Sequence, residues 1–217
     1  MVFVFATNNQ HKLEEARSIL SRISILSLSD IGLSADIPED GLTLEENSMY
    51  KCRFVSSYIC SKPEIYAKVS GCFSDDTGLE ISALGGAPGV HTARWAGEPV
   101  DSAANRRKAL AELKSMTDRS ARFRTVVTLE LWNNRNMIAE NGMVANNIQT
   151  MQFEGIVCGK IAAQEYGEQG FGYDPVFVPQ GYEHTFAELP AYIKNRISHR
   201  ARALAKMNDY IRNEVEL

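Results

Sequence analysis

The chain has 217 residues, of which 44% are hydrophobic and 23% are charged, and its formal net charge at pH 7 is -4. These proportions are those of an ordinary globular protein that can bury a full core as one domain. The acidic balance argues against a general binder of nucleic acid or membrane surfaces, so we expect neither as a partner. A small phosphorylated ligand stays possible, because it needs only a local group of cations.

Targeting signals and cysteine usage both predict a cytoplasmic protein. Residues 1–6 lack a basic segment and are too short for a signal sequence, and no apolar stretch approaches the length of a membrane span. The cysteines have neither C-x-x-C nor zinc spacing. We expect them to be reduced and to be buried as small hydrophobic side chains. They are Cys52, Cys60, Cys72 and Cys158.

The first third of the chain predicts alternating strands and helices. Residues 2–6 form a short apolar run typical of a buried strand, residues 12–20 fit a helix, and residues 25–28 fit a second strand. Thr43 and Glu46 have the spacing of a capping box, which predicts a helix start. The helix that follows would bury one stripe, made of Leu44, Ser48, Cys52, Val55 and Ile59.

The later part of the chain predicts a β-rich middle and a helical end. Asp101 or Ser102 should cap a helix that ends near residue 114. Residues 121–131 alternate between apolar and polar, which predicts a long half-buried strand, antiparallel to a neighbour such as residues 137–144. A last helix is expected over residues 198–212, with a core stripe at Ala201, Leu204, Met207 or Asn208, and Ile211. With no repeat or linker, residues 1–217 are predicted to be one domain.

Two adjacent carboxylates, Asp75 and Asp76, follow an apolar run that begins near Val69, and Thr77 and Gly78 come next. We expect the pair at a strand end, where open α/β sheets gather their ligands. Adjacent carboxylates repel and lose solvation, and a Mg²⁺ ion held by carboxylates and phosphates is the usual counter-charge. A solvated turn is the alternative, because turns favour the same residues.

A second candidate is the turn at residues 7–12, between the first strand and its helix. Helix starts present free N–H groups that suit a phosphate, and Lys12 adds a full charge. The spacing is not that of a Walker loop, and a simple helix N-cap is the alternative interpretation.

Two glycine-rich segments follow. Residues 85–90 predict a tight loop with a structural role. In residues 170–175, glycines flank Phe171 and leave its faces uncovered, as a stacking platform for a flat ring requires, with Asp174 beside it as a hydrogen-bond acceptor. A glycine-rich turn with a core phenylalanine is the alternative.

The last candidate is the basic segment of residues 194–200. Its cations are expected at a helix start, where the helix dipole does not favour them, so they indicate either a functional demand or a solvated end. His199 and Arg200 diverge by about a third of a turn on a helix and could grip two sides of one ligand. The other histidines have no metal-binding spacing with His199.

Taken in order, these segments resemble the inosine triphosphate pyrophosphatase family, whose members hydrolyse non-standard purine nucleoside triphosphates. The resemblance covers about residues 2–205, with departures at Asn8, where the family often has glycine, and at His11 and Asp40. The matching pattern is Thr7-x-Asn9-x-x-Lys12, Pro38-Glu39-Asp40-Gly41-x-Thr43 with Glu46-Asn47 and Lys51, Asp75-Asp76-Thr77-Gly78-Leu79, Gly85-Gly86-x-Pro88-Gly89, Gly170-Phe171-Gly172-Tyr173-Asp174-Pro175, Lys194, and Ser198-His199-Arg200.

The resemblance implies an α/β fold with a long mixed β-sheet flanked by helices, in two lobes with the active-site cleft between them. It also implies a homodimer that depends on Mg²⁺ and releases a nucleoside monophosphate and pyrophosphate. Asp76 would be the proton acceptor and a metal ligand, with Glu39 as the other acidic ligand, Asp75 in support, and Lys51 neutralising charge. The implied substrate-binding residues are Thr7, Asn8, Asn9, Gln10, His11, Lys12, Thr77, Phe171, Gly172, Tyr173, Asp174, Lys194, Ser198, His199 and Arg200.

Two other functions are compatible with parts of this pattern. One is a broader nucleotide pyrophosphatase acting on modified pyrimidine or methylated nucleotides, which predicts weak turnover of inosine triphosphate. The other is a nucleotide-sensing module without catalysis. That alternative expects loss of the acidic pair or of Lys51, and all three side chains are present.

Overall fold

The computed structural model describes residues 1–37, 39–133 and 147–215, so the strand expected at 137–144 lies outside the described residues. The chain divides into two compact units. Unit 1 comprises Met1–Asp76, Val126–Phe153 and Met207–Leu217, and unit 2 comprises Thr77–Thr125 and Glu154–Lys206.

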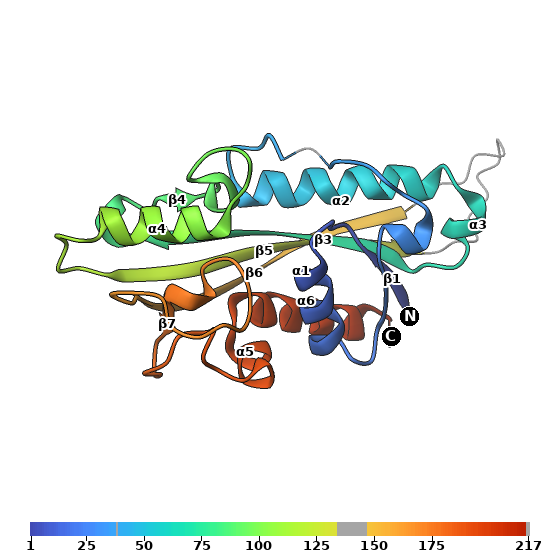
Figure 1. The fold of residues 1–217 in the computed structure, drawn as a ribbon. Helices are drawn as coiled ribbons and strands as arrows, with labels where there is room; N and C mark the ends of the chain where they lie inside the picture. Colours follow the sequence, from blue (N-terminus) through green and yellow to red (C-terminus); the bar gives the residue numbers. More distant parts are fainter. Residues whose placement is uncertain (38, 134–146, 216–217) are drawn as a thin grey trace. The chain divides into compact units, whose positions relative to one another are not determined.

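The strands form a mixed β-sheet, as expected from the sequence (Figure 1). Over the described residues the strand order is β2-β1-β3-β5-β6-β7, and β4 pairs with β3. β1 is parallel to both β2 and β3, whereas β4 is antiparallel to β3 and β7 is antiparallel to β6. The strands are β1 Val2–Phe5, β2 Ser24–Leu26, β3 Gly71–Ile81, β4 Pro88–Gly89, β5 Ser120–Asn133, β6 Asn147–Ile161 and β7 Phe177–Pro179.

The helices agree in order with the expected ones, with two additions, one after residue 60 and one near the C-terminus. They are α1 Gln10–Ile19, α2 Leu44–Cys60, α3 Pro63–Tyr66, α4 Ser102–Glu112, α5 Ala191–Ile197 and α6 His199–Val215. Short 3-10 turns lie at Ser29–Ile31, Ser82–Leu84, Thr92–Arg94 and Asp174–Val176. None of the helices in the described ranges is long and apolar enough to cross a membrane.

Helix α2 forms because its start is capped and one of its faces can be buried. The Thr43 hydroxyl accepts a hydrogen bond from the Glu46 N–H at 3.1 Å. The Glu46 carboxylate reaches back to the N–H of Leu42 at 2.7 Å, so the capping box closes one residue earlier than expected. All five residues of the predicted stripe are buried, and the stripe is confirmed. Within unit 1, α2 and α1 lie on opposite faces of the strands (Figure 1).

Each unit has its own hydrophobic core. In unit 1, Val4, Val55 and Trp132 belong to one buried cluster. In unit 2, Phe123 and Phe177 belong to another, with ring centroids 4.8 Å apart. Because each core is built from residues of one unit, each set of candidate site residues rests on a packed scaffold of its own.

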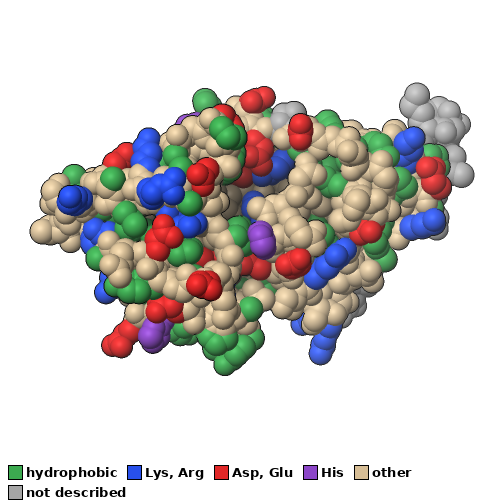
Figure 2. All heavy atoms as spheres, in the orientation of Figure 1, with side chains coloured by type: hydrophobic (Ala, Val, Ile, Leu, Met, Phe, Trp, Pro, Cys, Tyr) green, Lys and Arg blue, Asp and Glu red, His purple; other side chains and the backbone are tan. Residues whose placement is uncertain are grey.

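Two expectations about burial were wrong in part. The half-buried strand is confirmed for its first residues, but Thr128 and Glu130 are buried although they lie on the polar face. In unit 1 this face is covered by α2, whose Ser48 hydroxyl accepts a hydrogen bond from Thr128 at 2.8 Å. The four cysteines are free thiols as expected, but Cys158 is exposed and Cys60 is only half-buried. On the face drawn in Figure 2, acidic and basic side chains are interspersed.

Candidate active site

The acidic pair lies in the middle of β3 and not at its end, because the strand continues from Gly71 to Ile81. The solvated-turn alternative is therefore wrong: Asp75 and Asp76 are 1% and 7% exposed. Successive strand residues point to opposite faces of a sheet, so the two carboxylates separate. Asp75 pairs with Lys12 of α1 at 2.9 Å, and Asp76 pairs with Lys51 of α2 at 2.8 Å.

Lys51 is the centre of the cluster on the α2 side. Its Nζ lies 2.6 Å from Glu39 Oε1 and 2.8 Å from Asp76 Oδ1. Two carboxylates from separate segments thus converge on one cationic nitrogen. Carboxylate oxygens are the ligands that a hard divalent cation prefers, so the chemistry of Glu39 and Asp76 fits the metal-ligand roles that the resemblance implies.

Asn47 is a further member of this cluster, and the sequence assigned it no role. Its Nδ2 donates to Asp76 Oδ2 at 3.3 Å, and its Oδ1 accepts from the Gly41 N–H at 2.7 Å. It therefore ties the Asp76 carboxylate to the loop that carries Glu39. Asn47 and Lys51 are four residues apart in a predicted helix, and this spacing is the signal that could have placed both on one face.

The charges of the cluster are unequally compensated. Burial raises the pKa of Asp76 above its usual value and outweighs the opposing effects of Lys51 and Lys12. Burial also opposes the charge on Lys51, but Asp76, Glu39 and Asp75 together overcome it and raise its pKa. For the more exposed Glu39, Lys51 and Lys12 outweigh burial and lower the pKa. Lys51 is therefore held in its charged form, and of the two carboxylates that contact it, Asp76 takes up a proton more readily than Glu39.

At the start of α1 the N-cap interpretation of residues 7–12 is confirmed, and phosphate binding there stays a prediction. Asn9 is the N-cap, accepting from the Lys12 N–H at 3.1 Å, and Thr7 Oγ1 accepts from the Asn9 N–H at 3.1 Å. Asn8 donates to the Ala35 carbonyl at 3.0 Å. A cavity of about 440 Å³ opens here, lined by Thr7, Asn8, Asn9, Gln10, Leu13, Ser27, Leu28, Ser29, Gly32, Leu33 and Ser34. The capped helix start faces a space that can take an anion.

Gln10 and His11 have more peripheral positions in the first turn of α1. Both are exposed. The Gln10 side-chain amide donates to Glu14 one turn later at 3.1 Å. Lys12, in the same turn, is held against β3 by its pairing with Asp75.

In unit 2, the segment around Phe171 meets the basic segment. Asp174 accepts from the Phe171 N–H at 2.8 Å and forms a buried ion pair with Lys194. The Lys194 Nζ lies 4.7 Å from the centre of the Phe171 ring, and the Arg200 Cζ lies 5.8 Å from it. Gly170 permits this packing, because a Cβ there would come within 2.1 Å of the Asp174 carboxylate.

The last helix begins within one residue of its predicted start, but α5, which precedes it, was not predicted. Lys194 lies in the last turn of α5, where the helix dipole favours a cation, and not at a helix start. Ser198 separates the two helices, and its hydroxyl accepts from the Ala201 N–H at 3.2 Å.

His199 and Arg200 are linked to the same threonine, Thr77, by different contacts. His199 Nδ1 lies 2.5 Å from Thr125 Oγ1, which lies 2.7 Å from Thr77 Oγ1, and Arg200 donates to Thr77 at 3.4 Å. The His199 ring also stacks on Phe123, with centroids 4.7 Å apart. Sequence reasoning missed Thr125 and Phe123, since both read as ordinary strand residues.

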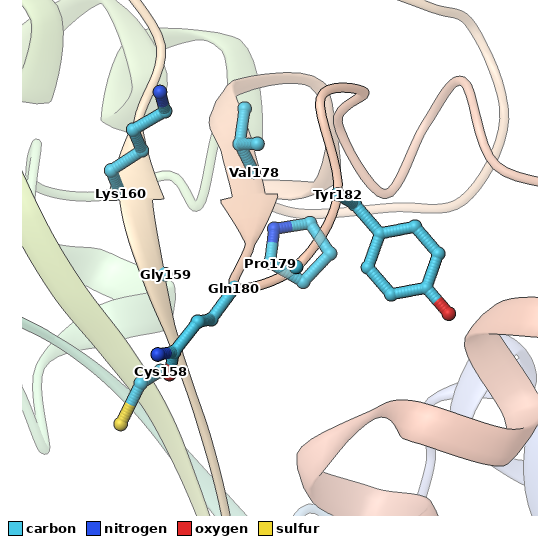
Figure 3. Close-up of a pocket in the computed structure, with 8 residues that line it drawn as sticks. Cys158, Gly159, Lys160, Val178, Pro179, Gln180 and Tyr182 are labelled. Atoms are coloured by element: carbon cyan, nitrogen blue, oxygen red, sulfur yellow. The ribbon is translucent and has the colours of Figure 1, made fainter.

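Gly172 and Tyr173 hold the loop in place. The Gly172 carbonyl accepts from Arg106 at 2.9 Å. The Tyr173 hydroxyl donates to the Thr92 carbonyl at 3.2 Å, and burial raises the pKa of its phenol. A pocket in unit 2, lined by Cys158, Lys160, Gln180 and Tyr182 among others (Figure 3), contains none of the predicted site residues.

The predicted site residues therefore form two groups. Unit 1 holds the acid–lysine cluster and the α1 start, and unit 2 holds Thr77 and the residues around Phe171 and Arg200. An α/β protein with a capped helix start, paired carboxylates and lysines, and a cation-flanked aromatic ring belongs to the class that binds phosphorylated ligands with flat rings.

The chain belongs to the Ham1 family, whose sequence model matches residues 3–210. The expected resemblance is thereby confirmed. The chain is 45% identical to the dITP/XTP pyrophosphatase of Porphyromonas gingivalis over 96% of each chain. It is 41% identical to the protein of the same name from Christiangramia forsetii, over 97% of this chain and 99% of that one.

Solved structures agree with this assignment. The Ham1 protein of Staphylococcus aureus is 33% identical with a TM-score of 0.77, covering 99% of this chain and 100% of that chain. A Ham1 protein from Coxiella burnetii is 32% identical with a TM-score of 0.78, covering 98% and 99%. The mixed α/β fold with a helix-flanked sheet is confirmed by both.

Proposed function

We propose that this protein hydrolyses non-standard purine nucleoside triphosphates, namely dITP, XTP and ITP, to the monophosphate and pyrophosphate. The observation that carries the proposal is the convergence of Asp76 and Glu39 on Lys51 in a chain of the Ham1 family. Relatives with 41–45% identity are named dITP/XTP pyrophosphatases.

The unit 1 group would act on the triphosphate. Glu39 and Asp76 would hold Mg²⁺, with Asp75 in support, and the bound cation would polarise the phosphate and acidify a water. Asp76, whose pKa burial raises, would accept the proton of the attacking water at the α-phosphorus. Lys51 would offset charge there, and Thr7–Lys12 would hold the phosphates with N–H groups and one ammonium.

The unit 2 group would take the base. Phe171 would stack on the purine ring, with Asp174, Lys194, Ser198, His199 and Arg200 around its edge and Thr77 on the phosphate side. ITP and XTP carry a 6-oxo acceptor, whereas ATP carries a 6-amino donor. The Arg200 guanidinium donates only, so it would match the oxo group and leave the amino group of ATP facing a donor. A site of this kind can reject the wrong analogue by up to about 10⁴–10⁵-fold.

The proposal also includes the oligomeric state and the cellular compartment. The family resemblance supports a homodimer acting on the cytoplasmic nucleotide pool. Light scattering coupled to gel filtration tests the dimer, and a mass corresponding to a single chain at micromolar concentration would contradict it.

The decisive experiment is phosphate-product analysis on a panel of nucleoside triphosphates with Mg²⁺. We expect pyrophosphate and monophosphate as first products, with dITP, ITP and XTP turned over far faster than ATP and GTP. Orthophosphate with a diphosphate as first products would overturn the cleavage position. Preferential turnover of modified pyrimidine or methylated nucleotides would support the broader pyrophosphatase.

Arg200→Ala tests the assignment of the base pocket. We expect it to narrow the gap between ITP and ATP in kcat/KM. Arg202→Ala is the matched control, since this exposed arginine of the same helix donates to the carbonyls of Ile197 and Ile156. Equal turnover of ATP and ITP by the unchanged protein would sink this account of the pocket.

A further inference from the structure

A buried polar seam runs between α2 and the strands of unit 1, separate from the carboxylates that converge on Lys51. On α2 it contains Ser48, Cys52 and Ser56, spaced by one helical turn. On the strands it is met by Cys72 of β3 and Glu130 of β5. All of these residues are buried. Seams between a helix and a sheet are normally apolar, so this composition needs a physical reason.

Among the residues of the seam, Glu130 is the one whose burial costs the most free energy. It is 5% exposed, and no ion pair or hydrogen bond of its carboxylate is found among the described residues. Buried carboxylates are normally paired with a cation, hydrogen-bonded, or bound to a metal. Its neighbours here are thiols: Cys52 Sγ, Cys72 Sγ and a Glu130 oxygen all lie within 4.8 Å of one another.

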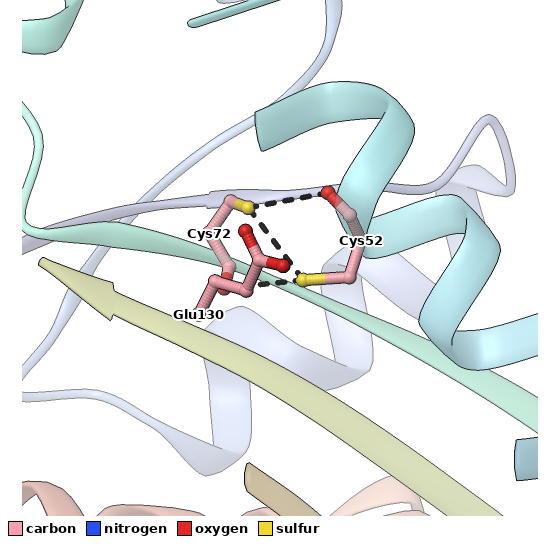
Figure 4. A group of neighbouring side chains, drawn as sticks. All are labelled: Cys52, Cys72 and Glu130. Carbon is pink, nitrogen blue, oxygen red and sulfur yellow. Dashed lines mark hydrogen bonds between the residues drawn. The ribbon is translucent and has the colours of Figure 1, made fainter. Parts of the chain in front are cut away.

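The geometry of the two sulfurs is that of a metal-binding pair. Figure 4 shows both thiols and the Glu130 carboxylate turned toward a common space. The two Sγ atoms are 3.6 Å apart. Two thiolates on one tetrahedral Zn²⁺, each with a bond of about 2.3 Å, are separated by about 3.8 Å, so little movement is required.

We propose that Cys52, Cys72 and Glu130 form a buried binding site for a thiophilic divalent cation of the Zn²⁺ class. The chemistry of the donors sets the preference, because thiolates favour Zn²⁺ over Mg²⁺, whereas Glu39 and Asp76 offer only oxygen. Three protein ligands leave a fourth position, which a water molecule can fill.

Binding exchanges protons for the cation. In the metal-free protein each thiol donates a weak hydrogen bond to the other's backbone carbonyl, at 3.6 and 3.5 Å. The contact with Cys52, together with burial, raises the pKa of the Cys72 thiol well above its usual value. The cation must therefore displace thiol protons, and its affinity should increase with pH. Once bound, it links α2 to β3 and β5 and stabilises unit 1 by mass action.

Cobalt provides the test, because Co²⁺ bound by thiolates has a charge-transfer absorption that Co²⁺ bound by carboxylates lacks. The full chain is reduced, stripped with a chelator, and incubated with Co²⁺ until the signal is constant. We expect about one thiolate-bound Co²⁺ per chain, displaced by Zn²⁺, which binds more tightly in such sites. Zn²⁺ should also raise the Tm of the metal-free protein.

Variants make the assignment specific. Cys52→Ala and Cys72→Ala should abolish the band and the Zn²⁺-dependent rise in Tm, and Glu130→Gln should weaken metal binding while both thiols remain. Cys158→Ala is the matched control, since this exposed thiol lies in unit 2, and the band should survive its loss. No thiolate band in the unchanged protein, or a band that depends on Cys158 alone, would overturn the proposal. If an alanine variant does not fold by circular dichroism, the Glu130→Gln titration decides.

Discussion

Removing the Lys51 ammonium is the sharpest test of the cluster in unit 1. Lys51→Met keeps most of the buried stem and deletes the charge that Asp76 and Glu39 share. Breaking a buried ion pair by removing one partner costs about 3–5 kcal/mol, because the other charge is left uncompensated. The Glu39 side chain is 42% exposed, so water screens its share, and Asp76 carries most of the penalty. We expect the free energy of unfolding to fall by about 3 kcal/mol at pH 7.

The pH dependence of this loss identifies its cause. Without Lys51, the folded-state pKa of Asp76 rises further above the value of about 3.9 for an unfolded aspartate. A carboxyl group with a raised folded pKa destabilises the fold only when it is ionised. The penalty is therefore absent below the unfolded pKa, grows as the pH rises through the folded pKa, and is full above it. The deficit of Lys51→Met should shrink between pH 7 and pH 5.

Urea denaturation followed by tryptophan fluorescence measures the change in the free energy of unfolding of unit 1. Trp132 is buried in unit 1, and the other tryptophan, Trp95, lies in unit 2, so a Trp95→Phe background makes the signal specific. The midpoint should fall while the slope m is kept. Lys68→Met, at an exposed lysine of the same unit, is the control. A loss below about 1 kcal/mol that does not change with pH would refute the reasoning, because surface ion pairs behave in that way.

Three further predictions concern activity. Asn47→Ala should lower kcat roughly tenfold with a smaller change in KM, because it removes a hydrogen bond of about 1.5 kcal/mol to charged Asp76. Steady-state kinetics measure both constants. Lys194→Met should raise KM for ITP roughly tenfold, because it removes the cation over Phe171 and leaves Asp174 buried without this lysine. An unchanged KM in a folded variant would contradict the prediction. Chelation of divalent cations should abolish turnover, and Mg²⁺ should restore it, as pyrophosphate release measures.

The sequence predicts the elements of this fold better than it predicts where they end. The apolar run from Val69 stops at Ser74, and charged residues follow, so the strand was expected to stop as well. It continues because Lys12 and Lys51, from segments far away in the chain, provide the counter-charges that let Asp75 and Asp76 be buried. A counter-charge that comes from tertiary structure is invisible to a local pattern.

The same limit applies to the site. The order of the motifs names residues in both groups, because each motif carries its own polar side chains. It does not show which residues hold them, as with Asn47 beside Asp76 and Thr125 between Thr77 and His199. A threonine in a strand or an asparagine in a helix is common, and only packing gives it a partner.

The two adjacent aspartates could share one role or have separate roles, and the structure favours separate roles. On β3 their carboxylates face different helices, Asp75 toward Lys12 and Asp76 toward Lys51. Asp76→Asn should lower kcat by at least about 10²-fold, the scale of one general base, with the fold intact. Asp75→Asn leaves that base in place and releases Lys12, so it should act mainly on KM for the triphosphate. Single-turnover and steady-state kinetics on both variants separate these effects. Near-normal kcat in a folded Asp76→Asn protein, with a large loss in Asp75→Asn, would move the proton acceptor to the α1 side of the strand.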